Sequence, residues 1–366
     1  MRATVDQAQF AQALTQASRL VNPQNTLPVL AGVEIQTTST GLLVYSTDLT
    51  TFLTIAVPAQ VSEPGRLAVS AQTLSELVRR IPLAHLEMVE QGGRLQVRYG
   101  RNRATLQTYG DQTLPEFPEV EGIRLTLPAG EFGDLNRELL FATSHDEMRS
   151  VLRGVALTYG HGRLVFQATD GTRFSHRWLP VPDVLDDPVT IVVPAKAMTE
   201  GARLWPDTAV TMTLGSKLAQ FEAQDMVLAT RLLEGTYPDL SHAAPETYIV
   251  TCRVSTNDLR GGLERVHLIT AKEHMASVKL HTLPGQGVEL TASSQDVGSL
   301  SEVVDCVCEG QELEILFNPQ YLIEGVRSFS DPDVIFELSG MQSAARIRGT
   351  DDSTYFHAVL PMRQLV

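Results

Sequence analysis

One pattern occurs three times along this chain of 366 residues. Its first marker is a valine inside an apolar run, at Val33, Val155 and Val278, with separations of 122 and 123 residues. The aspartate of a turn follows one strand later, and it recurs in the same order at Asp48, Asp170 and Asp296. Internal repetition constrains the architecture before any single motif does, because each copy has to fold into the same kind of unit.

Two further markers recur with the same period. A short apolar strand ends at a capping residue or a proline and leads into an amphipathic helix, at Ser70, Pro194 and Asn318, spaced 124 and 124 residues apart. A residue before a proline then closes each copy, at Phe117, Tyr237 and Leu360. The copies span residues 1–125, 126–247 and 248–366. Because solenoid units run only about 20–45 residues, each copy is expected to be a whole domain.

Each domain is expected to contain two helices and about eight strands. Apolar residues at helical spacing predict helices at residues 5–19, 71–81, 129–143, 195–205, 256–270 and 319–329. Most of the remainder alternates between apolar and polar residues, as in Leu95–Tyr99 and Val210–Leu214, and is broken by turns that contain Gly and Asp. The pattern predicts an α+β fold of three repeated domains, with antiparallel sheets that have one face exposed to solvent.

The composition excludes several classes of protein. No apolar run reaches the roughly 18 residues of a membrane span. The first residues are polar and contain no signal-peptide core, so we expect a cytoplasmic protein without a membrane partner. Three cysteines, Cys252, Cys306 and Cys308, are too few for a disulfide framework and have no zinc-site spacing. We expect free thiols that are buried or on an edge strand, no metal and no cofactor.

An enzyme is the first alternative, with Asp170 or one of His161, His176 and His267 as an acid–base group. The chain has no phosphate-binding Gly-Lys-Ser/Thr loop, no His-Glu-x-x-His and no nucleophile elbow. Asp48 and Asp170 follow strands at equivalent repeat positions, which favours a role in a turn. We therefore expect no catalytic residue.

Several segments resemble the bacterial β sliding clamp family, the processivity subunit of DNA polymerase III. They are Leu27-Pro-Val-Leu30, Ala168-Thr-Asp-Gly-Thr-Arg173, Gly235-Thr-Tyr-Pro-Asp239 and Val359-Leu-Pro-Met-Arg363. The resemblance covers the whole chain. It implies that two three-domain chains join head to tail into a six-domain ring around duplex DNA, with helices lining the hole and sheets outside.

Simple geometry agrees with that stoichiometry. A domain of this length has a radius of gyration of roughly 14 Å and a diameter of about 35 Å. Three such domains in a ring leave too little room for a duplex roughly 20 Å wide, whereas six leave an opening about 35 Å across. Two chains would therefore suffice to encircle DNA, and one would not.

The resemblance also implies an apolar pocket between the second and third domains that binds short motifs of client proteins. The expected clients are the catalytic subunit of the replicative polymerase, the clamp loader and other clamp-motif proteins. The expected pocket residues are Leu152, Thr169, Gly171, Arg173, Phe174, Pro238, Met275, Asn318, Tyr321, Val359, Leu360, Pro361, Met362 and Arg363. His242 and Thr172 depart from the family pattern, and Leu365-Val366 extends past the usual end, which leaves the client preference open.

The net charge of −14 argues against DNA binding at first sight. However, the six predicted helices hold nine basic and nine acidic residues, so the acidic excess lies elsewhere. A wall with few, exchangeable phosphate contacts would permit sliding. The predicted DNA-facing residues are Arg19, Arg79, Arg80, Arg137, His145, Arg149, Lys196, Arg203, Arg260, Arg265 and Arg327. The alternative for most of them is a favourable interaction of a cation with a helix C-terminus.

For ring closure, the resemblance points to Ala104 and Leu106 on a strand of the first domain. They would meet Leu268 and Ile269 of the third domain in the other chain, and edge strands would pair across the joint. The second alternative function is a β-rich protein-interaction scaffold that never touches DNA.

Overall fold

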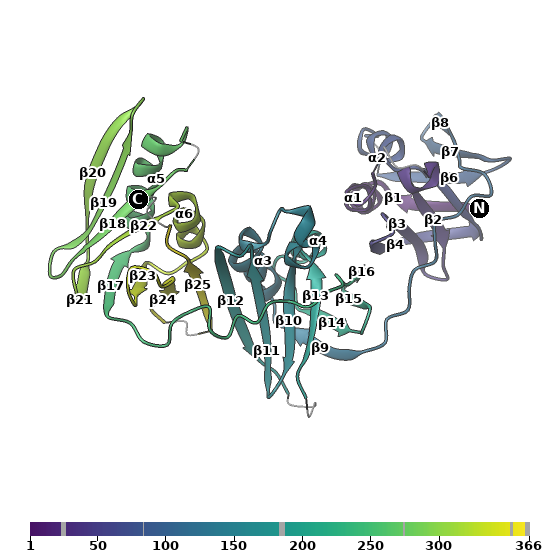
Figure 1. Cartoon of the computed structure of the whole chain (residues 1–366). Helices are drawn as coiled ribbons and strands as arrows, with labels where there is room; N and C mark the ends of the chain where they lie inside the picture. The colour runs from purple at the N-terminus through teal and green to yellow at the C-terminus, as the bar shows by residue number, and fades with distance from the viewer. Residues whose placement is uncertain (23–26, 83, 183–186, 274, 352–353, 363–366) are drawn as a thin grey trace. The chain divides into compact units, whose positions relative to one another are not determined.

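The computed structural model describes residues 1–22, 27–82, 84–182, 187–273, 275–351 and 354–362 (Figure 1). The first repeat contains β1 (Arg2–Asp6), α1 (Gln7–Ser18), β2 (Gly32–Thr37), β3 (Gly41–Thr47), β4 (Thr51–Glu63), β5 (Arg66–Ser70), α2 (Ala71–Arg79), β6 (His85–Glu90), β7 (Arg94–Tyr99) and β8 (Asn102–Gln107). The second contains β9 (Ile123–Leu127), α3 (Glu131–Leu139), β10 (Gly154–Gly160), β11 (Arg163–Thr169), β12 (Arg173–Pro180), β13 (Val189–Pro194), α4 (Ala195–Leu204), β14 (Val210–Leu214), β15 (Leu218–Ala223) and β16 (Met226–Arg231).

The third repeat contains β17 (Val250–Ser255), α5 (Thr256–Thr270), β18 (Val278–Leu283), β19 (Gly287–Ser294), β20 (Gly298–Asp305), β21 (Val307–Gly310), β22 (Glu314–Phe317), α6 (Pro319–Arg327), β23 (Asp333–Leu338), β24 (Ala345–Gly349) and β25 (Tyr355–Val359). The expected order of helices and strands therefore recurs in each copy.

Capping side chains fix where several helices begin. The Asp6 carboxylate accepts the backbone N–H of Gln9 at 3.0 Å, so α1 begins after Asp6. The prediction of a helix from residue 5 is therefore wrong, because Val5 belongs to β1, which is paired between β4 and β6. Asn318 caps α6 in the same way, and Pro319 occupies its first turn.

The other predicted helix ends differ by a few residues. The helix expected at 129–143 is shorter, because α3 covers Glu131–Leu139 and the chain then tightens into a 3₁₀ turn at Leu140–Ala142. Within the second repeat, the ring of Phe132 packs against α4. A Cβ on Gly201 would lie 2.6 Å from that ring, so glycine allows the close approach.

The strands form three antiparallel sheets. A twelve-stranded sheet includes the path β8-β7-β6-β1-β4-β16-β15-β14-β9. A nine-stranded sheet has the order β13-β10-β11-β12-β25-β24-β23-β17-β21, and a four-stranded sheet has the order β20-β19-β18-β22. The central repeat thus shares its strands between two sheets, one continuous with the first repeat and one with the third.

The chain accordingly divides into two compact units. The first unit comprises Met1–Gly133 and Glu200–Leu232, and the second comprises Asp134–Thr199 and Leu233–Val366. In the first unit, β4 pairs with β16, with Phe52 opposite Ala229. In the second unit, β12 pairs with β25, with Phe174 opposite Ala358. Neighbouring repeats are therefore joined by backbone ladders as well as by the covalent chain.

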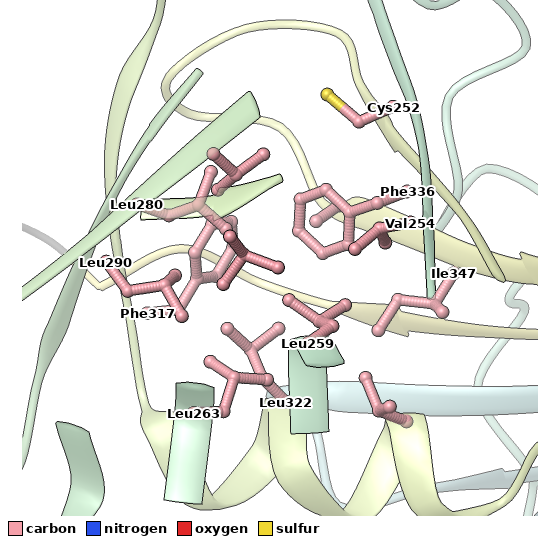
Figure 2. Packing of buried hydrophobic residues seen from close by; sticks show 14 of the residues in the cluster. Cys252, Val254, Leu259, Leu263, Leu280, Leu290, Phe317, Leu322, Phe336 and Ile347 are labelled. Carbon is pink, nitrogen blue, oxygen red and sulfur yellow. The ribbon is translucent and has the colours of Figure 1, made fainter. Parts of the chain in front are cut away.

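The core of the third repeat packs two helices on its sheets. Leu259 and Leu263 of α5 and Leu322 of α6 are buried against strand residues such as Phe317 and Phe336 (Figure 2). Burial of each such side chain stabilises the fold by about 1.5–3 kcal/mol. Among the described residues, no helix is both long enough and apolar enough to cross a membrane.

The cysteines correct the prediction of free thiols. Cys252 of β17 and Cys308 of β21 are bonded to each other, and Cys306 is the cysteine that keeps its thiol. The two bonded residues are 56 positions apart in sequence, but they lie opposite each other in the ladder. Sequence spacing cannot show such a contact, because it depends on strand register.

Candidate functional site

A concave pocket of about 590 Å³ opens on the second unit. It is lined by two stretches of the second repeat, by the segment at the end of that repeat (residues 238–245), and by parts of the third repeat. These residues are Leu152, Thr169, Gly171, Thr172, Arg173, Phe174, Pro238, Leu240, His242, Ala243, Pro245, Gln342, Ser343, Ala344, Ala358 and Leu360. A hollow of this size with a mostly apolar lining is typical of a site for a small molecule or a short peptide.

The floor of the pocket is a small apolar cluster at the ladder between β12 and β25. The ring of Phe174 is buried beside Ala344 and Ala358, and it meets the ring of Phe356 edge to face at 5.3 Å. Leu240 and Ala243, from the last segment of the second repeat, pack against the same cluster. Because alanine provides most of the contact around one aromatic ring, space remains for another side chain.

One wall is the turn that leads into β12. The Asp170 carboxylate accepts N–H bonds from Thr172 at 2.9 Å and from Arg173 at 3.2 Å. The backbone N–H of Gly171 donates to the Thr169 hydroxyl at 3.0 Å, and the φ of Gly171 is 95°. Glycine tolerates this left-handed conformation without strain. Asp170 therefore holds a turn, as expected.

The guanidinium of Arg173 is already surrounded by partners. Its Nε donates to Asp170 at 3.0 Å, one Nη donates to Glu324 of α6, and the other donates to the Phe141 carbonyl at 2.5 Å. The guanidinium also lies 4.3 Å from the ring centre of Tyr321. Two carboxylates thus balance the charge of Arg173, and the residue ties the second repeat to the third.

The pocket gathers half of the residues expected for it. Those that line it are Leu152, Thr169, Gly171, Arg173, Phe174, Pro238 and Leu360. Pro361 and Met362 line a second hollow of about 620 Å³, which shares Leu360 and Gln342 with the first. The second hollow is also formed by Glu314, Ile315, Leu316 and Met341.

Four other expected residues lie outside both linings. Val359 is fully buried in the core, and Asn318 caps α6. Tyr321 stacks on Arg173, so it supports the pocket from behind. Met275 is 58% exposed on the segment after α5. Arg363 lies outside the described residues.

The alanines and the polar rim were missed by the sequence reasoning. Ala243, Ala344 and Ala358 carry no motif, and Gln342 and Ser343 lie in an irregular segment before β24. The only available signal was the proline of the Tyr237-Pro238 marker, which placed the following segment near the second repeat. Thr172 and His242, the two departures from the family pattern, both line the pocket.

A buried polar layer lies beneath the pocket. His357 of β25 is fully buried, and its Nδ1 is 2.8 Å from the Ser175 hydroxyl of β12. Burial, reinforced by the charge of Arg173, lowers the pKa of His357 to about 3. Burial and Arg163 lower the pKa of His176 to about 4. Both imidazoles are therefore neutral near pH 7.

Most of the predicted DNA-facing arginines have an acidic partner. Seven form ion pairs within 4.0 Å, namely Arg80, Arg137, Arg149, Arg203, Arg260, Arg265 and Arg327. Arg19 and Arg79 lie exposed at the ends of α1 and α2, and neither has a carboxylate partner in the described part of the chain. Lys196 and His145 are also exposed.

The residues expected at a joint lie on two exposed elements. Ala104 and Leu106 are half-buried on β8, the last strand of the twelve-stranded path. Leu268 of α5 is 72% exposed, whereas Ile269 packs partly on the core of the third repeat. No group of three or more His, Cys, Asp or Glu residues able to hold a metal ion occurs among the residues whose positions are described.

Family models match three successive parts of the chain. They describe the N-terminal domain of the DNA polymerase III beta subunit at residues 1–120, its central domain at 126–239 and its C-terminal domain at 242–363. The beta sliding clamp of Bacillus subtilis is 24% identical over 376 residues, covering 99% of this chain and 100% of that protein. That of Halalkalibacterium halodurans is 26% identical, covering 99% and 100%.

Solved structures are similar over the same length. The DNA polymerase sliding clamp from Bacillus subtilis has a TM-score of 0.95 at 24% identity and covers 100% of this chain and 99% of that chain. The DnaN sliding clamp from Pseudomonas aeruginosa bound to griselimycin has a TM-score of 0.92 at 25% identity, with 99% of each chain covered.

Proposed function

Because the chain belongs to the DNA polymerase III beta subunit family, the beta sliding clamps, we propose that two copies close head to tail into a ring around duplex DNA. The ring tethers the replicative polymerase and thereby confers processivity. The observation that carries the proposal is the succession of three clamp domain models over nearly the whole chain. In this role the chain is a non-catalytic subunit that acts in the cytoplasm, where bacterial DNA lies.

The proposed joint brings β8 of one copy beside β20 of the other. Each is the terminal strand of its sheet path, so each has a row of backbone groups without a strand neighbour among the residues that the structure describes. Ala104 and Leu106 would then cover Leu268 and Ile269 of the second copy. Leu268 is 72% exposed in the single chain, so its burial in the joint would stabilise the dimer. Such a heterologous contact closes only if the rotation completes a circle.

The proposed DNA surface consists of the helices and the loop that carries His145 and Arg149. Arg19 and Arg79, at helix ends, are the basic residues best placed to meet a phosphate directly. The paired arginines contribute as well, because an exposed ion pair is worth only about 0–1 kcal/mol and exchanges readily for a phosphate. Weak, exchangeable contacts suit a ring that slides, since topology rather than affinity retains the DNA.

The proposed client site is the pocket around Phe174 together with the neighbouring hollow at Pro361 and Met362. An extended peptide could place one apolar side chain in the first and another in the second, because both share Leu360 and Gln342. The clients are the polymerase catalytic subunit, the clamp loader and other proteins with the same motif. The Pseudomonas aeruginosa clamp bound to griselimycin is a precedent for ligand binding in this family.

We also propose domain boundaries near residues 125 and 247. The boundary at 247 falls between β16 and β17, and the boundary near 125 falls at β9 (Ile123–Leu127), the strand that opens the second set of two helices and eight strands. The chain divides into two compact units because half of the strands of the central domain belong to the twelve-stranded sheet and the other half belong to the nine-stranded sheet.

Retention on DNA circles tests the proposal. The full-length protein, loaded by its clamp loader, is expected to remain on nicked circular DNA at high salt and to leave once the circle is cut. A protein that binds a groove of DNA would be retained on circular and linear DNA alike. The scaffold alternative would be retained on neither. Equal retention on circular and linear DNA would overturn the ring.

A further inference from the structure

The cysteines of the third repeat lie together at the edge of the nine-stranded sheet, where that edge meets a turn of the four-stranded sheet. Cys252 lies in the middle of β17 and Cys308 lies in β21, where the two residues face each other in the antiparallel ladder. Their Cα atoms are 4.0 Å apart and their sulfur atoms are bonded. Cys306 is two residues away and keeps its thiol. The bond therefore closes a loop that contains most of the third repeat's four-stranded sheet.

Strand β21 has little else to hold its side chains in place. It is the terminal strand of the nine-stranded sheet and has only four residues, Val307–Gly310. Cys308 is its one buried residue, whereas Val307 is 66% exposed. Short terminal strands open first in native-state fluctuations, because few buried contacts oppose the opening. The bond to Cys252 is thus the main side-chain anchor of β21.

Cys308 also connects β21 to the four-stranded sheet. Its carbonyl accepts the N–H of Gly285, in the turn between β18 and β19, at 3.1 Å. A single residue, Cys306, separates β21 from the end of β20 at Asp305. By holding Cys308 in place, the disulfide therefore fixes the contact between β21 and the four-stranded sheet. It also fixes the position at which β20 ends.

Strand β20 is the strand that the proposed ring uses. One of its edges pairs with β19, and its other edge has no strand neighbour among the described residues. Val303 of β20 is 50% exposed, and Glu302 holds Arg265 of α5, the helix that carries Leu268. The position of the free edge of β20 thus depends on Cys308, which lies three residues beyond the end of that strand at Asp305.

We propose that the Cys252–Cys308 disulfide is a redox-sensitive lock that holds β20 in the form needed to pair with a second copy. This inference rests on the proposed ring. A cellular dithiol would open the lock, because its thiolate attacks one sulfur, breaks the S–S bond and forms a mixed disulfide. The second thiol of the reductant then displaces the protein sulfur. Two electrons pass to the protein, which gains two thiols, and the reductant leaves as a disulfide.

The surroundings make this reduction slow. Cys252 and Cys308 are buried, so a reductant has to wait until β21 opens. Exchange within the protein is also disfavoured, because burial and the charge of Asp305 raise the pKa of the Cys306 thiol to about 11. A protonated thiol is a poor nucleophile. The lock therefore responds to sustained reduction rather than to brief changes.

Counting thiols tests whether the bond forms. The full-length protein is purified without reductant, unfolded in denaturant and treated with an alkylating reagent. We expect the reagent to label Cys306 alone. After reduction it should label at all three cysteines. Labelling of all three before reduction would overturn the proposal.

Sedimentation equilibrium tests the effect on the ring. Reduction is expected to raise the dimer Kd roughly tenfold, and Cys308→Ser should do the same without a reductant, while the matched Cys306→Ser variant keeps the original Kd. The Tm of the reduced protein should fall by roughly 10 °C, since a loop of this length is no longer closed. Circular dichroism of the reduced wild type checks that the fold persists.

The outcomes separate the two proposals. A dimer with the same Kd in both redox states would overturn the lock and leave the ring intact. An oxidised protein that stays monomeric at high concentration would overturn the ring itself, and with it the lock.

Discussion

The first and second repeats have the same turn before a strand that pairs with the next repeat, and in the described part of the chain a pocket of about 590 Å³ lies beside the second of these turns. Asp48 accepts N–H bonds from Thr50 at 3.0 Å and from Thr51 at 2.7 Å, as Asp170 does in its own turn. Phe52 and Phe174 then follow at the same position, each opposite an alanine of the next repeat. The backbone is therefore equivalent in both places.

The difference lies in the side chains that surround the phenylalanine. Around Phe52, the rings of Tyr45 and Phe117 meet each other at 6.2 Å, and Phe117 meets Phe52 at 6.3 Å. Leu114 completes this cluster, which we call the filled junction. Around Phe174 the neighbours include Ala243 and Ala344, and the pocket remains. Side-chain volume, rather than chain path, decides which junction can receive a ligand.

Charge separates the two junctions as well. The position of Arg173 in the second repeat is held by Thr51 in the first, so this position carries the cation of the Asp170–Arg173–Glu324 network at the pocket and a neutral side chain in the filled junction. Beneath the pocket there is also His357, whereas Ala229 and Leu228 of β16 provide apolar contacts in the filled junction. The pocket thus has a polar frame where the filled junction has apolar packing.

The largest expected effect comes from removing the charge that frames the pocket. Arg173→Met removes the buried cation that Asp170 and Glu324 share, and breaking this partly buried ion-pair network should cost about 3 kcal/mol in the free energy of unfolding. Thermal unfolding should show the loss, and the matched Thr51→Val variant in the first repeat should cost less than about 1 kcal/mol. Equal losses at the two positions would refute the distinction between the junctions.

Filling the pocket should make the second junction resemble the first. Ala344→Phe places a ring where a client side chain would lie, so we expect at least a hundredfold weaker binding of a labelled peptide from the polymerase subunit, or about 2.7 kcal/mol. The Tm should change little. Ala129→Phe, on an exposed turn, is the control in a fluorescence anisotropy titration, and unchanged binding by Ala344→Phe would place the client elsewhere.

Emptying the filled junction is expected to have a smaller effect on stability. Phe117→Ala removes a half-buried ring, which should cost about 2 kcal/mol in the free energy of unfolding. Leu240→Ala, in the wall of the open pocket, should cost less than about 1 kcal/mol, because water already reaches that site. Urea titrations of both variants provide the comparison, and it would be contradicted if Leu240→Ala were the more damaging.

Lowering the pH should destabilise the strands beneath the pocket before it destabilises the filled junction. The pKa of His357 is lowered on folding, so the unfolded chain gains a proton first as the pH falls below 6.5, and stability is lost from there down to about pH 3. At pH 5.5 the loss from His357 alone is about 1.4 kcal/mol, a tenfold change in protection from hydrogen exchange, and His176 adds to it because its pKa is also lowered on folding. Peptides from β25 should show it more than peptides from β16. His357→Asn should reduce this difference to the part that His176 contributes, and an unchanged difference would assign the effect to another group.

The repeat markers predicted much of the fold because they are local. A capping residue before an amphipathic helix and an aspartate in a turn act within a few residues, so Asn318 and Asp170 could be interpreted without coordinates. The start of α1 was misplaced, because Val5 is apolar at helical spacing but pairs in β1 instead. Tertiary pairing outweighed the local pattern there.

The site was predictable only where a motif marks it. Leu152, Thr169 and Phe174 lie in or beside the second repeat's conspicuous segments, and they line the pocket. Ala344 and Ala358 could not be found, because small residues leave space only through what surrounds them. Arg173 was expected to meet a ligand, but its partners Glu324 and Phe141 come from distant parts of the sequence.

The sequence by itself determined the number of repeats, their order of helices and strands, and the turns that Asp48 and Asp170 hold, since these depend on interactions within about one turn of chain. Only the tertiary structure decided that Cys252 meets Cys308, that Arg173 is balanced by two carboxylates, and that the second junction is open. Each of these depends on strand register and packed volume between segments far apart in the chain, which no local pattern encodes.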